Sequence, residues 1–487
     1  MHRASRRRVV IVGLARQGSA LARYFCEQGD RVVVTDLRPA SALEKQIASL
    51  AGMPVEYVLG GHPFTVLDEC DLLCLSGGVP PETPLPQEAR KRGILLSNDS
   101  LLTIRLSPTP AVGITGSSGK TTTTTIVGNM LRTSGFKTWV GGNIGLPLID
   151  RLSDIGPEDK MVLELSSFQL QLFSEPPPVS PHVAAVLNVT PNHLDRHPSM
   201  AHYVAAKANI VRFQSRSTDD VVVLNADDMI VGEWWRKGQV NIEQDTGQDT
   251  LKFPIAARRV GFSMTQDVPE GAFLRHEQII WRRGGHETRI CSTGEIVLRG
   301  RHNVANVLAA CAISGVAGAT PEAMRQVATT FAGVPHRLEL VRDRNGVRWY
   351  NDSIATTPER LAAALESFDE PLILLAGGRD KHLPWQEMAH LTLAKVRHLL
   401  LFGEAAELIE KEIDIARECS SSPSPLQVRQ CGELATAVET ANQLACAGDV
   451  VLLSPGGTSF DAYADFEERG RHFQALVNAL ERQTDDR

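Results

Sequence analysis

The chain has 487 residues, a formal net charge of −7, 43% hydrophobic residues and 22% charged residues. That length suggests about three domains, the acidic balance argues against a nucleic-acid partner, and no stretch approaches the roughly 18 apolar residues of a membrane span. The eight cysteines form no CxxC pair, which favours reduced thiols in a cytoplasmic protein over disulfides or a zinc site.

The first segment predicts a Rossmann-like domain over residues 1–107. A strand-like run at 7–13 is followed by a helix-like run at 14–29 and a second strand-like run that ends in an acidic residue. This is the order of a dinucleotide-binding βαβ unit, although Ala15 replaces the middle glycine of its fingerprint. The turn still suits a phosphate group at a helix N-terminus. A plain crossover without a ligand remains the alternative.

The second segment, 108–334, begins after the proline-containing stretch LSPTP, which is typical of a linker. Strand-like and helix-like runs alternate in it, which predicts a parallel sheet with helical crossovers. Its later part, at about 232–300, is more polar and contains short strand-like runs. We expect small antiparallel additions there.

A glycine-rich loop, GSSGKT at 116–121, follows a strand-like run and opens a helix-like run in this segment. It is shorter than the common P-loop, because Ile114 stands at the position of the first glycine. The physical basis is the same: small residues let backbone N–H groups surround phosphate oxygens at a helix N-terminus. Lys120 can reach the β- and γ-phosphates, and the Thr121 hydroxyl can bind Mg²⁺.

Three further polar residues of this segment are candidates for a metal site. Glu164 lies in an apolar strand-like run, His193 follows another such run, and Lys207 lies among alanines in a helix-like run. Taken singly, each also suits a structural ion pair, a loop histidine or a solvated lysine. Their presence in one domain with a phosphate loop favours phosphoryl transfer.

The third segment, 335–487, predicts a second doubly wound sheet. Apolar strand-like runs at 347–353, 371–378, 396–403 and 449–457 each end in small or polar residues. In such sheets the functional loops lie at the strand ends. The fold class predicted for the whole chain is therefore α/β with three domains: a Rossmann-like domain, a central P-loop ATPase-type parallel sheet, and a second Rossmann-like domain.

The motifs together resemble the Mur ligases, the ATP-dependent amino-acid ligases of peptidoglycan synthesis, and above all their glutamate-adding branch. Nearly the whole chain takes part, in the family's order, through the motifs TGSSGKTTTT, GGNIGLPL, LELSSFQL, NVTPNHLDRH, AAKANI, LNADD, GRHNVANVLAA, GVPHRLE, YNDSIATTP, AGGRDK and LLSPGGTSFD. No DNPR motif occurs, which argues against the diaminopimelate- and lysine-adding relatives.

The resemblance implies a reaction, its cofactors and its location. ATP phosphorylates the carboxylate of UDP-N-acetylmuramoyl-L-alanine, and the amine of D-glutamate then attacks the acyl phosphate. It also implies two Mg²⁺ ions, a carbamylated lysine at Lys207, and a cytoplasmic monomer that acts in cell-wall synthesis, cell shape and division. Desolvation lowers the pKa of a lysine, and only the neutral amine reacts with CO₂, so the alanine-rich surroundings of Lys207 fit this modification.

By the same resemblance, matching residues receive roles. The expected catalytic residues are Lys120, Glu164, His193 and Lys207. The expected metal ligands are Thr121, Glu164, His193 and Lys207. The expected ATP-binding residues are Gly116, Ser117, Ser118, Gly119, Lys120, Thr121, Thr122, Asn303, Asn306, Arg337 and Asp352. The expected substrate-binding residues are Arg38, Ser76, Asn143 and Ser166, with Thr356, Lys381, Ser459 and Phe466 around the glutamate.

This chain also departs from the family pattern. Ile354 stands where a lysine is expected, so any charge needed there is absent or supplied elsewhere. Arg16, Gln17 and Leu37 differ at the turn expected to face UDP. The alternatives are a ligase that uses L-glutamate, whose stereochemistry the sequence does not reveal, and a folylpolyglutamate synthase-like ligase, which the first domain disfavours. A nucleotide-dependent regulator is disfavoured because no guanine-reading NKxD motif occurs.

Overall fold

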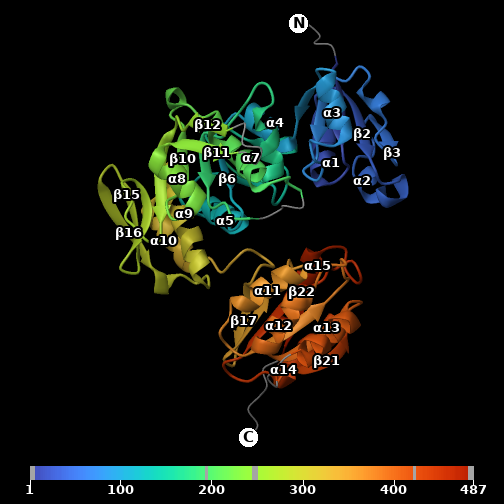
Figure 1. Ribbon diagram of the computed structural model, residues 1–487, viewed down its shortest axis with the longest axis vertical. Helices are drawn as coiled ribbons and strands as arrows, with labels where there is room; N and C mark the ends of the chain where they lie inside the picture. Colours follow the sequence, from blue (N-terminus) through green and yellow to red (C-terminus); the bar gives the residue numbers. More distant parts are fainter. Residues whose placement is uncertain (1–5, 192–195, 244–249, 420–423, 481–487) are drawn as a thin grey trace. The chain divides into compact units, whose positions relative to one another are not determined.

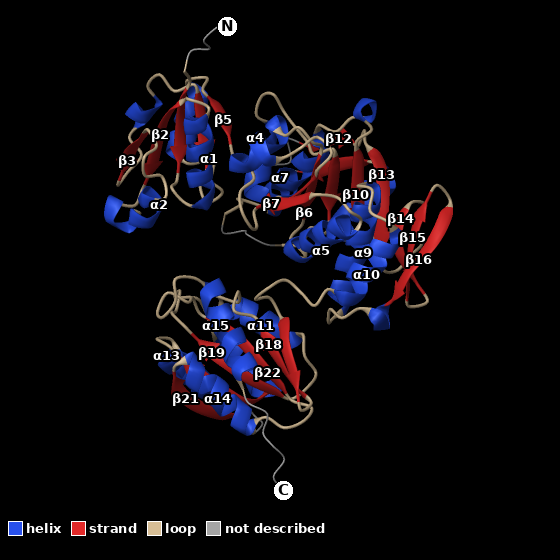
Figure 2. Cartoon of the chain, turned by 180° about the vertical axis from the view of Figure 1, so that it is seen from behind, coloured by secondary structure: helices blue, strands red, loops and turns tan. Residues whose placement is uncertain are grey.

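The structure is a computed structural model that describes residues 6–191, 196–243, 250–419 and 424–480. By its internal contacts the chain divides into two compact units, residues 1–297 with 301–331, and residues 298–300 with 332–487. Both units are built from sheets covered by helices (Figures 1 and 2). This confirms the predicted α/β class, whereas the boundaries at 107 and 334 stay predictions.

The first sheet of the first unit is parallel throughout, in the order β3-β2-β1-β4-β5. Its central strand is an unbroken run of buried valine and isoleucine, as expected for a strand covered on both faces. The strands are β1 (Arg8–Val12), β2 (Arg31–Asp36), β3 (Val55–Leu59), β4 (Leu72–Leu75) and β5 (Leu95–Ser97). The helices are α1 (Arg16–Glu27), α2 (Glu44–Ala48), α3 (Pro84–Lys91) and α4 (Asp99–Leu106).

The second sheet of this unit has the order β16-β15-β14-β13-β10-β9-β6-β8-β7. Its parallel strands are β6 (Ala111–Thr115), β7 (Thr138–Gly142), β8 (Lys160–Glu164), β9 (Val183–Val186), β10 (Val221–Asn225), β13 (Arg258–Ser263) and β14 (Gly271–Arg275). The helices are α5 (Lys120–Thr133), α6 (Ser167–Leu170), α7 (Met200–Arg212), α8 (Met229–Lys237), α9 (Arg301–Val316) and α10 (Pro321–Thr330).

The antiparallel additions predicted for this sheet are confirmed. β14 pairs antiparallel with β15 (Gln278–Arg283), and β15 with β16 (His286–Ser292). A separate ribbon pairs β11 (Gln239–Glu243) with β12 (Thr250–Pro254). In Figure 1 the strands β15 and β16 extend from the edge of the sheet beyond its helices.

The second unit contains one sheet in the order β17-β18-β22-β19-β20-β21. Its strands are β17 (Glu339–Arg344), β18 (Val347–Asn351), β19 (Leu372–Gly377), β20 (Val396–Phe402), β21 (Gln427–Gly432) and β22 (Val450–Gly456), all parallel except β17. The helices are α11 (Pro358–Glu366), α12 (Gln386–Lys395), α13 (Ala406–Glu418), α14 (Leu434–Leu444) and α15 (Phe466–Ala479). The sheet lies between α11, α12 and α13 on one face and α14 and α15 on the other.

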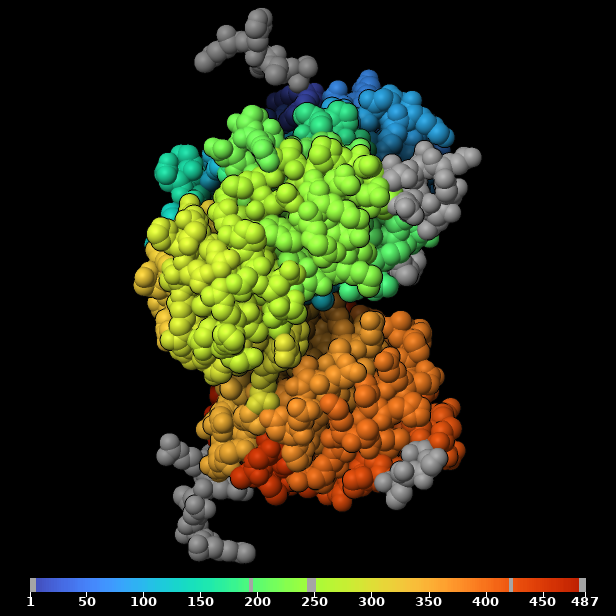
Figure 3. Space-filling view, turned by 60° about the vertical axis from the view of Figure 1, so that its left-hand side comes forward, coloured from blue at the N-terminus to red at the C-terminus, as the bar shows by residue number. Residues whose placement is uncertain are grey.

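The packing of each unit leaves its strand ends as the places where polar side chains gather. In the space-filling view, side chains cover the surface of each unit (Figure 3). The motifs follow the carboxyl ends of β6, β8, β9, β18, β19 and β22, where open α/β sheets bind their ligands. Within the described ranges, no helix is both long enough and apolar enough to cross a membrane.

Candidate active site

The phosphate loop lies between the carboxyl end of β6 and the first turn of α5. Gly119, its last residue, has a φ of +77°, and a β-carbon there would stand 2.3 Å from Oδ1 of Asn306. The left-handed backbone and the close approach both require glycine. Among the described residues, no side chain caps the N-terminus of α5. Its first backbone N–H groups are therefore suited to binding an anion.

Two residues outside the loop hold it in shape. The backbone N–H of Ser117 donates to the carbonyl of Asn188 (3.0 Å), and that of Ser118 donates to Asn188 Oδ1 (2.9 Å). The hydroxyl groups of Ser117 and Tyr203 lie 3.0 Å apart. Sequence reasoning missed both residues, although Asn188 begins the motif NVTPNHLDRH and Tyr203 lies two residues before the motif AAKANI.

Lys120 folds back onto the loop. Its Nζ donates to the carbonyl oxygens of Gly116 (2.8 Å) and Ser117 (3.2 Å). Because a lysine ammonium group has three donors on a flexible stem, it can exchange these carbonyls for phosphate oxygens. Asn306, predicted to contact the nucleotide, lies on α9 beside the loop and donates to Oδ1 of Asn303 (2.9 Å). Thr122, also predicted to contact ATP, is buried in the first turn of α5.

A hydroxyl group, a carboxylate and an amide meet beside the loop. Thr121 Oγ1 donates to Glu164 Oε2 (2.8 Å), and Asn143 Nδ2 donates to Glu164 Oε1 (2.8 Å). Glu164 is only 2% exposed, so these hydrogen bonds offset the loss of water around a carboxylate. Oxygen donors of this kind are the ligands that Mg²⁺ prefers. Ser166 caps α6 through a capping box with Gln169.

Lys207 is buried beside the same loop. It is 1% exposed, its Nζ donates to the carbonyl of Gly116 (2.8 Å), and it lies 4.6 Å from the ring centre of Tyr203. Burial, and then the charge of Lys120, lowers the pKa of Lys207 well below its usual value, against the opposite effect of Glu164. Such a setting favours the neutral, nucleophilic form of a lysine amine.

The residues present fit one Mg²⁺ ion as they stand. Thr121 and Glu164 supply adjacent oxygen donors, whereas an unmodified Lys207 offers no metal ligand. His193 lies outside the described residues, and its role stays a prediction. Within the described ranges, no group of three or more His, Cys, Asp or Glu side chains could hold a metal ion.

The residues expected to face UDP gather at the carboxyl ends of β1, β2 and β4. Arg38 donates to both carboxylate oxygens of Asp36, at 3.0 and 2.8 Å. Burial opposes ionisation of Asp36, but hydrogen bonds from Arg38 and Leu14 prevail and lower its pKa to about 2. Ser76 donates to the carbonyl of Gly13 (2.7 Å). Gln17, one of the departures from the family pattern, accepts the N–H of Gly77 (2.7 Å).

In the second unit, the residues predicted to bind glutamate lie at neighbouring strand ends. Lys381, after β19, donates to Thr356 Oγ1, after β18, at 3.2 Å. Ser459 is buried after β22, and Phe466 begins α15.

The residues of this unit predicted to contact the nucleotide lie beside the carboxyl end of β18. Asp352 directly follows this strand, and burial raises its pKa to about 7, against hydrogen bonds from Ser454 and Leu338. Arg337 precedes β17, close in sequence to the start of the unit.

A residue that sequence reasoning missed ties these strand ends together. Arg469 is 0% exposed and donates to Ser353 Oγ and O (3.0 and 2.9 Å), to the carbonyl of Gly457 (3.2 Å) and to that of Thr458 (3.1 Å). Ser353 in turn donates to the carbonyl of Phe466 (2.8 Å). Burial lowers the pKa of Arg469 to about 10. Its position three residues after Phe466, on the same face of a helix, was the available signal.

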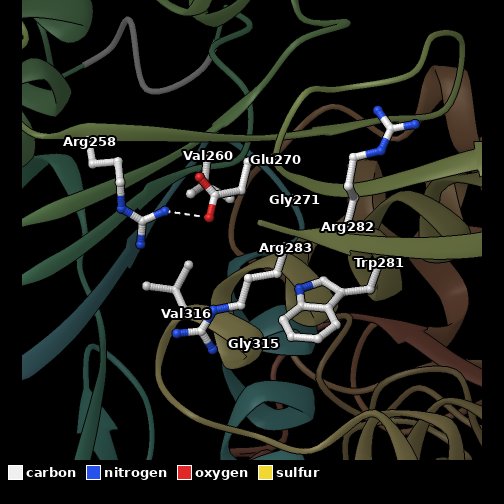
Figure 4. A pocket seen from close by; sticks show the side chains of 9 residues that line it. All are labelled: Arg258, Val260, Glu270, Gly271, Trp281, Arg282, Arg283, Gly315 and Val316. Carbon is white, nitrogen blue, oxygen red and sulfur yellow. Dashed lines mark ion pairs between the residues drawn. The ribbon is translucent and has the colours of Figure 1, made fainter. Parts of the chain in front are cut away.

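A shallow pocket on the antiparallel extension lies apart from this chemistry. Figure 4 shows Trp281 beside Gly315 and the ion pair of Arg258 with Glu270 at 2.6 Å. Gly315 is near the C-terminal end of α9, whereas Asn303 is at its N-terminal end. At 1.5 Å per residue the two ends are about 20 Å apart. The pocket is therefore not part of the candidate active site.

The fold and the site define a class of nucleotide-dependent α/β enzymes with a phosphate loop on a parallel sheet. Family models agree with this class along the chain. A model of the Mur ligase MurD-like N-terminal domain matches residues 7–97, the Mur ligase middle domain matches 114–314, and the Mur ligase glutamate ligase domain matches 336–457.

Full-length relatives narrow the assignment. The UDP-N-acetylmuramoylalanine–D-glutamate ligase of Symbiobacterium thermophilum is 44% identical over 476 residues, which is 97% of this chain and 98% of that protein. The enzyme of the same name from Acetivibrio thermocellus is 38% identical over 98% of this chain and 97% of its own length. The chain belongs to the Mur ligase family and is an ATP-dependent ligase. The resemblance predicted from its motifs is thus confirmed.

Solved structures share the fold at low sequence identity. The UDP-N-acetylmuramate–alanine ligase of Thermotoga maritima is 17% identical, with a TM-score of 0.54, over 97% of this chain and all of that chain. MurF of Acinetobacter baumannii is 16% identical, with a TM-score of 0.53, over 96% of this chain and 92% of that chain. These structures agree with the three-domain α/β architecture.

Proposed function

We propose that this chain adds D-glutamate to UDP-N-acetylmuramoyl-L-alanine at the expense of ATP, in the synthesis of peptidoglycan precursors. The observation that carries the proposal is the 44% identity, over nearly the full length of both chains, to a ligase named for this reaction. The site is compatible with it, since a phosphate loop, a buried carboxylate and a strand-end lysine are the parts that such a reaction requires.

The first step makes the carboxylate a competent acyl donor. A carboxylate oxygen of UDP-N-acetylmuramoyl-L-alanine attacks the γ-phosphorus of ATP, ADP leaves, and an acyl phosphate forms. The N–H groups of the loop and the N-terminus of α5 stabilise the transferring phosphoryl group. Lys120 releases the carbonyls of Gly116 and Ser117 and binds the phosphates instead.

Two Mg²⁺ ions belong to the proposal. Thr121 and Glu164 hold the first, while His193 and a carbamylated Lys207 hold the second. When bound, the ions neutralise charge between the phosphates and the anionic acceptor. The low exposure of Lys207 and its lowered pKa support the modification. Its neutral Nζ attacks the carbon of CO₂ and loses a proton, which leaves an anionic oxygen ligand in place of a cation.

The second step forms the amide. The neutral amine of glutamate attacks the acyl carbon, a tetrahedral intermediate forms, the nitrogen loses a proton, and phosphate leaves with its electron pair. Lys381 pairs with a carboxylate of the amino acid, and Thr356, Ser459 and Phe466 lie on the neighbouring segments of the second unit. Arg38 and Ser76 serve the UDP-sugar at the first sheet, and Arg337 and Asp352 serve the nucleotide.

Phosphate release from ATP in the presence of UDP-N-acetylmuramoyl-L-alanine and one amino acid tests the proposal. We expect turnover with D-glutamate and little with L-glutamate or meso-diaminopimelate. Equal turnover with L-glutamate favours the L-glutamate alternative, and turnover with a folate in place of the UDP-sugar favours the folylpolyglutamate synthase-like one. We further propose that the protein is a monomer and acts in the cytoplasm. Its nucleotide substrates are made in that compartment, and its free cysteines remain reduced there.

A further inference from the structure

Two cations of the second unit are attached to one short segment of backbone. Arg360 Nη1 donates to the carbonyl of Ile354 (3.3 Å), which also accepts the N–H of Thr356 (2.9 Å). Lys381 Nζ donates to Thr356 Oγ1 (3.2 Å). Residues 354–356, after the carboxyl end of β18, thus accept hydrogen bonds from both a guanidinium group and an ammonium group.

Neither cation forms an ion pair with a described residue. Among the residues that the structure describes, no carboxylate oxygen lies within 4.0 Å of either group. Arg379, two residues before Lys381, shows the contrast, because it makes two bonds of 2.8 Å to Glu404. Asp380 is also engaged, by the backbone N–H of His382 (2.9 Å) and the indole of Trp385 (3.1 Å).

The arrangement is electrostatically unfavourable without a ligand. Arg360 lies in the first turn of α11, where the helix dipole disfavours a positive charge. Partial burial, and then the charge of Arg360, lowers the pKa of Lys381. Two neighbouring cations at a strand end suit a ligand with two negative charges, because its two carboxylates offset the mutual repulsion of the cations.

We propose that Arg360 is a specificity-determining residue, whose guanidinium binds one carboxylate of the incoming dicarboxylic amino acid while Lys381 binds the other. The inference rests on the proposed function. Nε and Nη2 of Arg360 make no hydrogen bond to the described residues, so a fork is available for a bidentate pair with a carboxylate. The guanidinium lies at the carbonyl of Ile354, the position where the family pattern led us to expect a lysine, and α11 supplies the charge instead.

Kinetics with Arg360→Gln test the proposal, with Arg417→Gln on α13 as the matched control. Arg417 is a helical arginine of the same unit whose partner is Asp414 (2.9 Å). We expect Arg360→Gln to raise KM for D-glutamate about 10- to 100-fold, the value of a charged hydrogen bond. KM for ATP and for the UDP-sugar should not change. Arg360→Lys should recover part of the lost affinity for D-glutamate, because lysine keeps the positive charge but lacks the two parallel N–H donors of a guanidinium group.

KM values for two amide analogues of D-glutamate distinguish direct binding by Arg360 from a merely structural role. D-Glutamine lacks the side-chain carboxylate, and D-isoglutamine lacks the α-carboxylate. If Arg360 binds one of these groups, Arg360→Gln will weaken D-glutamate strongly and leave the analogue without that group nearly unaffected. Additive losses with both analogues, or an unchanged KM for D-glutamate, would overturn the proposal. A wild-type protein that does not turn over D-glutamate would instead refute the proposed function.

Discussion

Among the described residues, each compact unit contains a cation that is at most 1% exposed, and the two are accommodated in different ways. Lys207 in the first unit has hydrogen bonds to the Gly116 carbonyl and, at 3.5 Å, to Thr115, and its pKa falls well below the usual value. Arg469 in the second unit donates to the backbone of three residues, and the pKa remains about 10. Burial favours the neutral form of Lys207, whereas hydrogen bonds to three carbonyls offset the burial of Arg469. The first is therefore suited to reaction, and the second to holding structure.

The largest expected effect is that of Lys207→Ala on activity. Loss of a metal ligand should lower phosphate release at least about 100-fold, while the fold survives because alanine suits a helix. Acetate should restore part of the activity by placing a carboxylate in the vacated space. Lys207→Arg should respond less, because guanidinium keeps its charge and fills that space. Full activity of Lys207→Ala would contradict the carbamate proposal.

Arg469→Leu should have the converse effect, on stability. The carbonyls of Ser353, Gly457 and Thr458 would lose their donor, and we expect the second unit to lose at least about 2 kcal/mol of stability. Denaturant unfolding of the full chain measures this loss, with Lys207→Met as the control that leaves the second unit unchanged. If Arg469→Leu unfolds like the wild type, the buried arginine is not structural and the contrast with Lys207 disappears.

Gly119→Ala tests the phosphate loop beside which Lys207 lies. The positive φ and the 2.3 Å approach of Asn306 together oppose a β-carbon, and strain of about 1–3 kcal/mol should weaken ATP binding roughly 5- to 100-fold. Gly135, just past the other end of α5, has a φ of +92° with open space around its β-carbon position. Gly135→Ala should lower the Tm without changing KM for ATP. An equal effect of both changes on KM would show that the loop itself is not involved.

Asp352→Asn should change the stability in a way that depends on pH. The folded pKa of Asp352 is raised from 3.8 to about 7, so between these values the folded state holds a proton that the unfolded state has lost. The wild type therefore loses stability as pH rises from 3.8 to about 7. The variant should be more stable than the wild type at pH 8, by a few degrees in Tm, and this gain should vanish near pH 4. A gain that does not depend on pH would contradict the raised pKa.

Local pattern was sufficient for the parts of the site that follow directly from a strand. The loop 116–119, Glu164 at the end of β8 and Lys381 after β19 all lie at carboxyl edges of sheets, because the alternation of apolar runs and small residues specifies strand ends. The roles of these residues stay predictions, as does that of His193. The antiparallel strands β15 and β16 followed from the same reasoning about short polar runs.

Contacts between distant segments were beyond that reasoning. Arg469 lies in a polar stretch that reads as a solvated helix, and its burial depends on Ser353, 116 residues away. Asn143, expected near the UDP-sugar, donates to Glu164. The sequence did not indicate that Arg360 and Lys381 both donate to residues 354–356, because the two cations follow different strands.

The sequence by itself determined the α/β class, the phosphate loop, the family and the residue types at the strand ends, because these depend on periodicity and on motifs that are contiguous in the chain. The tertiary structure decided which charges are buried, which are paired, and which have no carboxylate partner among the described residues. Lys207, Arg469 and Arg360 are all cations in helices, yet one is desolvated, one is held by carbonyls and one faces a second cation. Burial and pairing arise where separate elements meet, and no local pattern specifies them.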